Sequence, residues 1–300
     1  MRFLVLLNPH ANLNARSAGE SLEQRCTDLF REHRADVEVR TVDPHRLQAV
    51  AREAQRENFD VIAVGGGDGS VSAVAGALAG TETPMGVLPM GTLNHFARDL
   101  ELPASLEQAA RVIVAGLPRT VDVGEVNGRI FVNNASIGIY PHVVTHRNRQ
   151  MHRLGRGKWT AMIFALIAAL RRFPTVRVRV GVHGQSHLQT TPFVFVGNNE
   201  YAVNLFQLGE RNRIDAGELC IYFTERTGRL GLLRLAVGAL LGRLSQDKDF
   251  LALSGKELWV DSAKRELRVA LDGELVPLTP PLRFVSRARA LKVMCDRRDS

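Results

Sequence analysis

Residues 61–78, VIAVGGGDGSVSAVAGAL, restrict the fold more than any other stretch of the sequence. Apolar residues typical of a buried strand lead into three glycines and an aspartate, and a helix of small residues follows. A strand that passes directly into a helix is typical of strand–helix–strand units, which build parallel sheets. The glycines also leave backbone N–H groups unpaired at a helix N-terminus, where anions bind well. Tight turns use glycine for steric reasons alone as well, so both interpretations stay open.

Strands and helices alternate throughout residues 1–120. We expect strands at 2–7, 37–42, 60–66 and 84–91, and helices at 22–33, 44–57, 70–80 and 105–116. Ser105 and Gln108 are spaced as in a capping box at the start of the last helix. The alternation predicts an α/β domain with an open parallel sheet, and we place its boundary near residue 120.

Residues 121–300 contain many short strands instead. We expect a hairpin around Asn127 and Gly128, and strands at 133–138, 175–182, 191–199, 218–224, 257–262, 266–274 and 290–295. Helices are expected at 158–173 and 229–244. This pattern predicts a mostly antiparallel, β-rich second domain, either a sandwich or barrel-like, whose final strand is free to return to the first domain.

Basic residues are concentrated in the second half. The chain carries a net charge of +8, with 12 Lys and Arg against 15 Asp and Glu in residues 1–120 and 27 against 16 in residues 121–300. Between residues 126 and 199 there are ten Lys and Arg and no acidic residue. Such asymmetry indicates an anionic partner: a membrane surface, a nucleic acid or a phosphorylated ligand. An ordinary solvated basic face is the alternative.

The three cysteines, Cys26, Cys220 and Cys295, are too widely spaced for a disulfide framework or a paired metal site. No apolar run approaches the roughly 18 residues needed to span a bilayer. We therefore expect a cytoplasmic protein that meets membranes only at their surface.

A second polar turn follows one strand later, in GVLPMGTLNHFARDLELP (86–103). In a parallel sheet this turn lies beside the glycine turn, at the edge where open α/β folds bind ligands. Together the two motifs resemble the catalytic domain of diacylglycerol kinases and related lipid kinases. The resemblance extends to Asn8-Pro9, to NNASIG (133–138) and to VALDGE (269–274), and so covers nearly the whole chain. It implies an NAD-kinase-like first domain and a β-rich domain on the lipid side.

The resemblance also implies ATP and Mg²⁺ as cofactors and assigns roles to particular residues. Glu274 matches the general base of the family, with Asp272 and Asp68 as further catalytic carboxylates. The residues that match its nucleotide contacts are Asn8, Thr41, Gly66, Gly67, Asp68, Gly69, Ser70, Val71, Ser72, Thr92 and Asn94. Without the other motifs, LDGE would be read as a hairpin turn with Asp-Gly at its centre.

Three positions depart from the family pattern. His95 and Ala73 stand where relatives often carry a carboxylate. Ala216 matches the aspartate of a structural metal site, and Asp215 lies one place too early. The resemblance therefore does not assign the metal ligands, and it leaves open a non-catalytic relative that binds lipid or nucleotide.

The segment 147–159 is basic, contains no acid and ends in Trp159, a residue suited to lipid headgroups. The apolar residues 159–170 after it are too few to span a bilayer. The two helices expected at 158–173 and 229–244 could instead be core helices of the second half. We expect a lipid at an anionic membrane surface as partner, and not nucleic acid, since the segment has few aromatic residues for base stacking. The sequence is also compatible with a homodimer.

These observations predict an ATP-dependent lipid kinase that transfers the γ-phosphate to a lipid hydroxyl, with a diacylglycerol-like acceptor. The rival hypotheses are the non-catalytic relative and an NAD kinase-like enzyme. The GTLN segment and the basic second half disfavour an NAD kinase.

Overall fold

The computed structural model describes residues 1–11, 21–138, 175–182, 185–201, 211, 213–224 and 250–297. The helices expected at 158–173 and 229–244 and the basic segment 147–159 lie outside the described residues.

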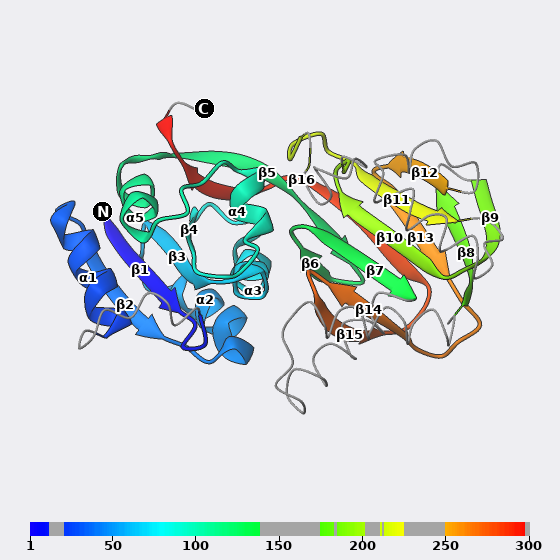
Figure 1. Cartoon of the computed structure of the whole chain (residues 1–300), viewed down its shortest axis with the longest axis horizontal. Coiled ribbons are helices and arrows are strands. Elements are labelled where there is room, and N and C mark those ends of the chain that lie inside the picture. The colour runs from blue at the N-terminus through cyan, green and yellow to red at the C-terminus, as the bar shows by residue number, and fades with distance from the viewer. Residues whose placement is uncertain are drawn as a thin grey trace.

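Within the described ranges, the helices lie in the first half and strands occur throughout (Figure 1). The helices are α1 (Leu22–Glu32), η2 (Pro44–Arg46), α2 (Leu47–Ala54), α3 (Asp68–Leu78), α4 (His95–Asp99) and α5 (Leu106–Ala115). The strands of the first half are β1 (Arg2–Leu7), β2 (Asp36–Thr41), β3 (Val61–Gly66) and β4 (Met85–Pro89). The remaining strands are β5 (Leu117–Val126), β6 (Arg129–Phe131), β7 (Asn134–Gly138), β8 (Val176–Val182), β9 (Gln185–Thr191), β10 (Phe193–Asn198), β11 (Leu219–Thr224), β12 (Phe250–Gly255), β13 (Glu257–Asp261), β14 (Leu267–Leu271), β15 (Glu274–Leu278) and β16 (Leu282–Cys295).

The first half is a parallel sheet covered by helices on both faces, as predicted. Strands β2, β1, β3 and β4 lie in that order and are parallel. Alternate residues of β1 point to opposite faces, because successive side chains of a strand alternate. Leu4 and Leu6 pack in one cluster with α2 and α3, whereas Phe3 and Val5 pack in another with α1 and α5. Both faces of the parallel sheet are therefore buried, and the edge at the carboxyl ends of the strands is the place where a ligand could bind.

Strand β16 joins this sheet to the second half. It is parallel to β4 at Val293 and antiparallel to β5 and β13. Its register against β5 shifts between Arg287 and Leu291, where Arg289 adopts a positive φ of 52°. One ten-stranded sheet therefore runs through both halves, and the last strand, β16, pairs with β4 of the first half (Figure 1).

The second half is an antiparallel sandwich. A six-stranded sheet, in the order β12-β11-β10-β7-β14-β15, packs against β8, β13 and β16 of the large sheet. Phe223 and Phe284 contribute to the core between them from the two sides. Strands β9, β12 and β15 were not predicted. Each pairs with a single strand, and each lacks a clear apolar alternation that sequence reasoning could detect.

A buried ion pair connects the halves. Arg211 donates to Asp99 of α4 at 2.7 Å, and the two side chains are only 1% and 2% exposed. Its guanidinium also donates to the carbonyl of Val132 at 2.7 Å and to Asn133 Oδ1 at 3.3 Å. A helix of the first half and the entry to β7 are therefore held by the same cation.

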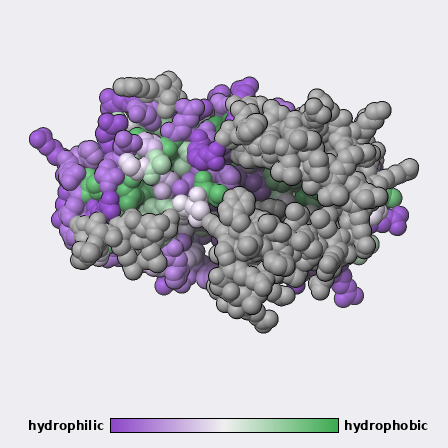
Figure 2. Space-filling view, in the orientation of Figure 1, coloured by the Kyte–Doolittle hydropathy of each residue, from purple (hydrophilic) through white to green (hydrophobic). Residues whose placement is uncertain are grey.

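On the face shown in Figure 2, hydrophilic residues gather along the margins of the first half, and a paler, partly hydrophobic band runs between them. Over the described ranges, no helix has the length and apolar character needed to cross a bilayer.

Replacing Arg211 by Met should lower the free energy of unfolding by about 3–5 kcal/mol, because Asp99 would remain buried without its partner. Denaturant titration measures this change. Arg283→Met is the matched control: its pair with Glu257 is exposed, so the loss should be about 0–1 kcal/mol. Equal losses for the two variants would contradict a stabilising role for the buried pair.

Candidate functional site

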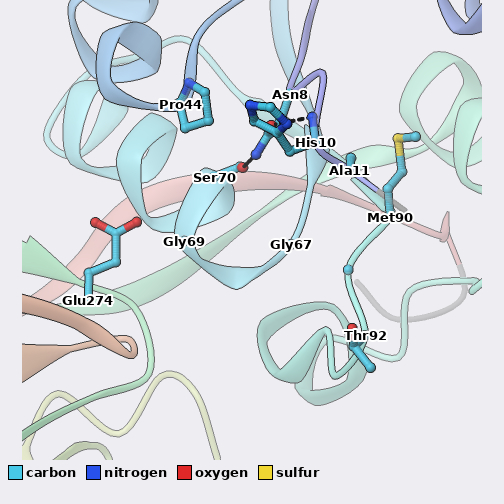
Figure 3. Close-up of a pocket in the computed structure, with 11 residues that line it drawn as sticks. Asn8, His10, Ala11, Pro44, Gly67, Gly69, Ser70, Met90, Thr92 and Glu274 are labelled. Carbon is cyan, nitrogen blue, oxygen red and sulfur yellow. Dashed lines mark hydrogen bonds between the residues drawn. The ribbon is translucent and has the colours of Figure 1, made fainter. Parts of the chain in front are cut away.

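A cleft of about 370 Å³ opens at the carboxyl edge of the parallel strands (Figure 3). It is lined by Asn8, His10, Ala11, Pro44, Gly67, Gly69, Ser70, Met90, Gly91, Thr92 and Glu274. All but Glu274 belong to the first half. The cleft therefore combines the two polar turns of the parallel sheet with one carboxylate from the second half.

The glycine turn supplies one wall. Gly67 is the N-cap of α3 and has no side chain that could pair with the first N–H groups of the helix. A Cβ on Gly66 would lie 2.5 Å from Ser70 Oγ, so the turn has no room for a larger residue there. Asn8, which follows β1, donates its side-chain amide to Ser70 Oγ at 2.8 Å (Figure 3). Unpaired N–H groups and two small polar side chains thus face the same space, an arrangement suited to an anion.

The second turn lies against the first. Asn94 Oδ1 accepts from the N–H of Gly91 at 2.8 Å, and its amide donates back to the Gly91 carbonyl at 3.1 Å. A Cβ on Gly91 would lie 2.5 Å from Gly67 Cα, which means that the two backbones are in direct contact. Asp68 accepts from the N–H of Phe96, at the start of α4, at 3.3 Å. Two segments of separate sequence therefore form one continuous surface.

Glu274 is the carboxylate that reaches the cleft. It begins β15, and its side chain points toward the first turn of α3 (Figure 3). A Cβ on Gly69 would lie 2.7 Å from Glu274 Oε1, so only glycine admits the carboxylate this closely. Partial loss of solvent raises the pKa of Glu274, nearby His45 opposes the increase and the charge of Asp272 adds to it. A carboxylate with a raised pKa is better suited to accept a proton.

Asp272 has a different environment. Its Oδ1 accepts from the N–H groups of Asn133 and Asn134, at 2.8 and 2.9 Å, and its Oδ2 accepts from Val132 at 2.8 Å and from the Ser72 hydroxyl at 2.6 Å. Burial raises the pKa of Asp272, and these hydrogen bonds oppose the increase. Asp272 and Gly273 have φ values of 46° and 89°, as a type I′ hairpin turn requires. The hairpin turn and the family motif are thus the same feature.

The remaining predicted contacts lie around the cleft or beyond it. Thr41 is exposed at the end of β2, and Gly66 is buried at the end of β3. Val71 points into the hydrophobic core, 4% exposed, and Ser72 faces Asp272. Five lining residues have no counterpart among the predicted contacts: His10, Ala11, Pro44, Met90 and Gly91. His10 and Ala11 follow the Asn8-Pro9 motif closely, which is the signal that could have indicated them.

Around Ala216, the described residues offer no structural metal site. The neighbouring N–H of Gly217 donates to the carboxylate of Asp122 at 2.6 Å, and the N–H of Arg289 donates to it at 2.8 Å. Asp122 is 1% exposed, so backbone donors satisfy this carboxylate. Within the described ranges, no group of three or more His, Cys, Asp or Glu side chains is placed to hold a metal ion.

Comparison with protein families gives two matches that together cover most of the chain. Residues 2–126 match the diacylglycerol kinase catalytic domain, and residues 133–295 match the YegS C-terminal NAD kinase beta sandwich-like domain.

Individual relatives agree with these matches. The chain is 28% identical over 275 residues to the probable lipid kinase YegS of Salmonella arizonae, and 27% identical over 271 residues to a probable YegS-like lipid kinase of Klebsiella pneumoniae. Each comparison covers 87% of both chains. Among solved structures, a putative diacylglycerol kinase from Bacillus anthracis superposes with a TM-score of 0.74 at 23% identity, covering 100% of this chain and 98% of the other. This last similarity concerns the fold alone.

Substituting Gly91 by Ala should weaken ATP binding at least tenfold. The added Cβ would meet the backbone of Gly67 at 2.5 Å, and a backbone cannot move aside as a flexible side chain can. Calorimetric titration with ATP measures the loss. Gly80→Ala is the control: Gly80 has a positive φ of 80° with nothing within 4 Å, so only backbone strain is added, away from the cleft. Unchanged ATP affinity in the Gly91 variant would mean that the cleft does not hold the nucleotide.

Proposed function

The chain belongs to the YegS-like family of lipid kinases, and we propose that it transfers the γ-phosphate of ATP to the hydroxyl of a diacylglycerol-like lipid, with Glu274 as general base. The diacylglycerol kinase catalytic domain implies the use of ATP. The position of Glu274 carries the proposal, since it is the one carboxylate that lines the described cleft, and it lies against the glycine turn.

The glycine turn is the proposed site of the ATP phosphates. The N-terminus of α3, with Gly67 as its N-cap, offers backbone donors and the positive end of the helix dipole. Ser70, held by Asn8, adds a hydroxyl at the same surface. Phosphoryl transfer depends mainly on positioning and charge stabilisation, which such an array of donors supplies.

Asp68 is the residue that we propose to hold Mg²⁺ together with the phosphates. Mg²⁺ commonly binds through one or two carboxylates plus substrate phosphates, and Asp68 begins α3 beside the proposed phosphate site. Bound there, the ion would neutralise charge on the transferred phosphoryl group. Asp68 itself, through its hydrogen bond to the N–H of Phe96, holds the two turns together.

The three carboxylates of the motif residues then have separate tasks. Glu274 accepts the proton of the lipid hydroxyl as the lipid oxygen attacks the γ-phosphorus, and the bond from the γ-phosphorus to the bridging oxygen breaks so that ADP leaves. Asp272 is saturated by four donors, so its oxygens are poorly placed to accept another proton. We therefore propose that Asp272 fixes the hairpin turn that carries Glu274.

For the acceptor, we propose a lipid presented at an anionic membrane surface. The support is compositional, since ten Lys and Arg and no acidic residue occur between residues 126 and 199. Each basic residue near such a surface contributes about 1 kcal/mol.

Glu274→Gln should lower kcat by about 10²–10⁴-fold, because the amide preserves shape but cannot accept a proton. Transfer of radiolabelled phosphate from ATP to diacylglycerol in anionic vesicles measures this effect. ATP affinity should change little. Glu266→Gln, at an exposed residue outside the cleft lining, is the control and should retain full activity. Full activity of the Glu274 variant would exclude it as the base, and absence of transfer by the wild type under any metal would favour a non-catalytic relative.

The activity should fall at acid pH with an apparent pKa above the ordinary glutamate value of about 4.3. The folded-state pKa of Glu274 is raised, so the carboxylate is lost to protonation at a higher pH than usual. His45 opposes the increase; His45→Gln should therefore move the acid limb of kcat/KM to still higher pH. The pH–rate profiles of the wild type and of the His45→Gln variant measure both effects. An acid limb at the ordinary glutamate value would contradict the assignment.

A further inference from the structure

We infer that Ser72 is a positioning residue for Glu274 and not a contact of the nucleotide. The inference rests on the proposed role of Glu274 as the base. Sequence resemblance grouped Ser72 with the phosphate-binding glycine turn. The structure gives the Ser72 hydroxyl a different partner, the carboxylate of Asp272, 200 residues away in sequence, at 2.6 Å.

Two residues of α3 contact the hairpin turn of Asp272, Gly273 and Glu274. Gly69 and Ser72 are three residues apart, so they lie on the same face of the helix. Gly69 lies against the Glu274 carboxylate, where a Cβ would approach Oε1 to 2.7 Å. Ser72 holds the other end of the turn through Asp272. The helix that begins at the proposed phosphate site therefore also sets the position of the base.

Ser72 supplies the only bond from α3 among the four that Asp272 accepts in the described structure. The other three donors are the N–H groups of Val132, Asn133 and Asn134, which belong to the second half like Asp272 itself. Without the Ser72 hydroxyl, the turn stays attached to its own half but loses its polar bond to the helix. Glu274 would then sample positions relative to the γ-phosphate that the wild type excludes.

Placement in the cleft separates this role from nucleotide binding. Ser70 lines the cleft, but Ser72 does not appear in its described lining. Ser70 and Ser72 point about 200° apart around the helix, so the hydroxyl engaged with Asp272 is directed away from the face that Ser70 presents to the cleft. Ser72 should thus influence the rate of transfer more than ATP binding.

Kinetics of Ser72→Ala, Ser72→Thr and a matched control test the inference. Ser72→Ala should lower kcat about ten- to a hundredfold, since a displaced catalytic group can cost about 10²-fold, while ATP affinity stays within about twofold of wild type. Ser72→Thr keeps the hydroxyl and should restore most of kcat. The control is Thr81→Ala, which removes a part-buried hydroxyl bonded to the Leu78 carbonyl near the other end of α3, and it should leave kcat unchanged.

A second measurement does not depend on activity. The destabilising effects of Ser72→Ala and Asp272→Asn on thermal unfolding should be less than additive when combined, as for directly bonded residues. Additive effects would contradict the hydrogen bond between Ser72 and Asp272. If the Asp272→Asn variant does not fold, the kcat of Ser72→Thr relative to Ser72→Ala still tests the role of the Ser72 hydroxyl.

Each other outcome has a defined meaning. Weakened ATP binding with kcat retained would return Ser72 to the nucleotide site and overturn the inference. Lower stability with unchanged kcat would make the bond merely structural and overturn it as well. A wild type without lipid phosphorylation would refute the proposed function, whereas the unfolding cycle would still report on the Ser72–Asp272 bond.

Discussion

The carboxylate of Asp272 organises the region where the two halves meet. It accepts three backbone N–H groups from Val132–Asn134 and a hydroxyl from α3. A charged acceptor makes shorter and stronger hydrogen bonds than a neutral one, and N–H groups left unpaired at such a partly buried site would be costly. The hairpin turn, the entry to β7 and the helix after the glycine turn are therefore held around one side chain.

Arg211 extends this cluster to the second polar turn. It donates to the carbonyl of Val132, whose N–H is bound by Asp272, and it pairs with Asp99 of α4. The helices that follow both turns, α3 and α4, are consequently connected to the same short segment of the second half. Since both ions of the Asp99 pair are desolvated, the pair requires good geometry, and loss of either partner would leave a buried charge.

Much of the fold could be predicted because its signals are local. The alternation in residues 1–120 and the apolar run before Gly65 reveal strands and helices within windows of about a dozen residues. The five-residue α4 and strand β9 could not be predicted in this way, because they are short or lack a clear periodicity. The positions of Pro44 and Met90 in the cleft carry no local signal either.

The sequence by itself determined the glycine turn and the Asp-Gly hairpin turn, and with them the family resemblance. The glycine turn depends on close contacts that leave no room for a Cβ, and the hairpin turn depends on positive φ values that few residues adopt. Only the tertiary structure decided which side chains of these motifs meet. Val71 enters the core, Ser70 lines the cleft and Ser72 reaches Asp272, although the three are adjacent in the chain. Successive helical residues point about 100° apart, so their partners depend on the elements packed around α3. Strand β16 makes that packing possible, because it joins the sandwich to β4. No local sequence pattern encodes the contact between Ser72 and Asp272, which are 200 residues apart.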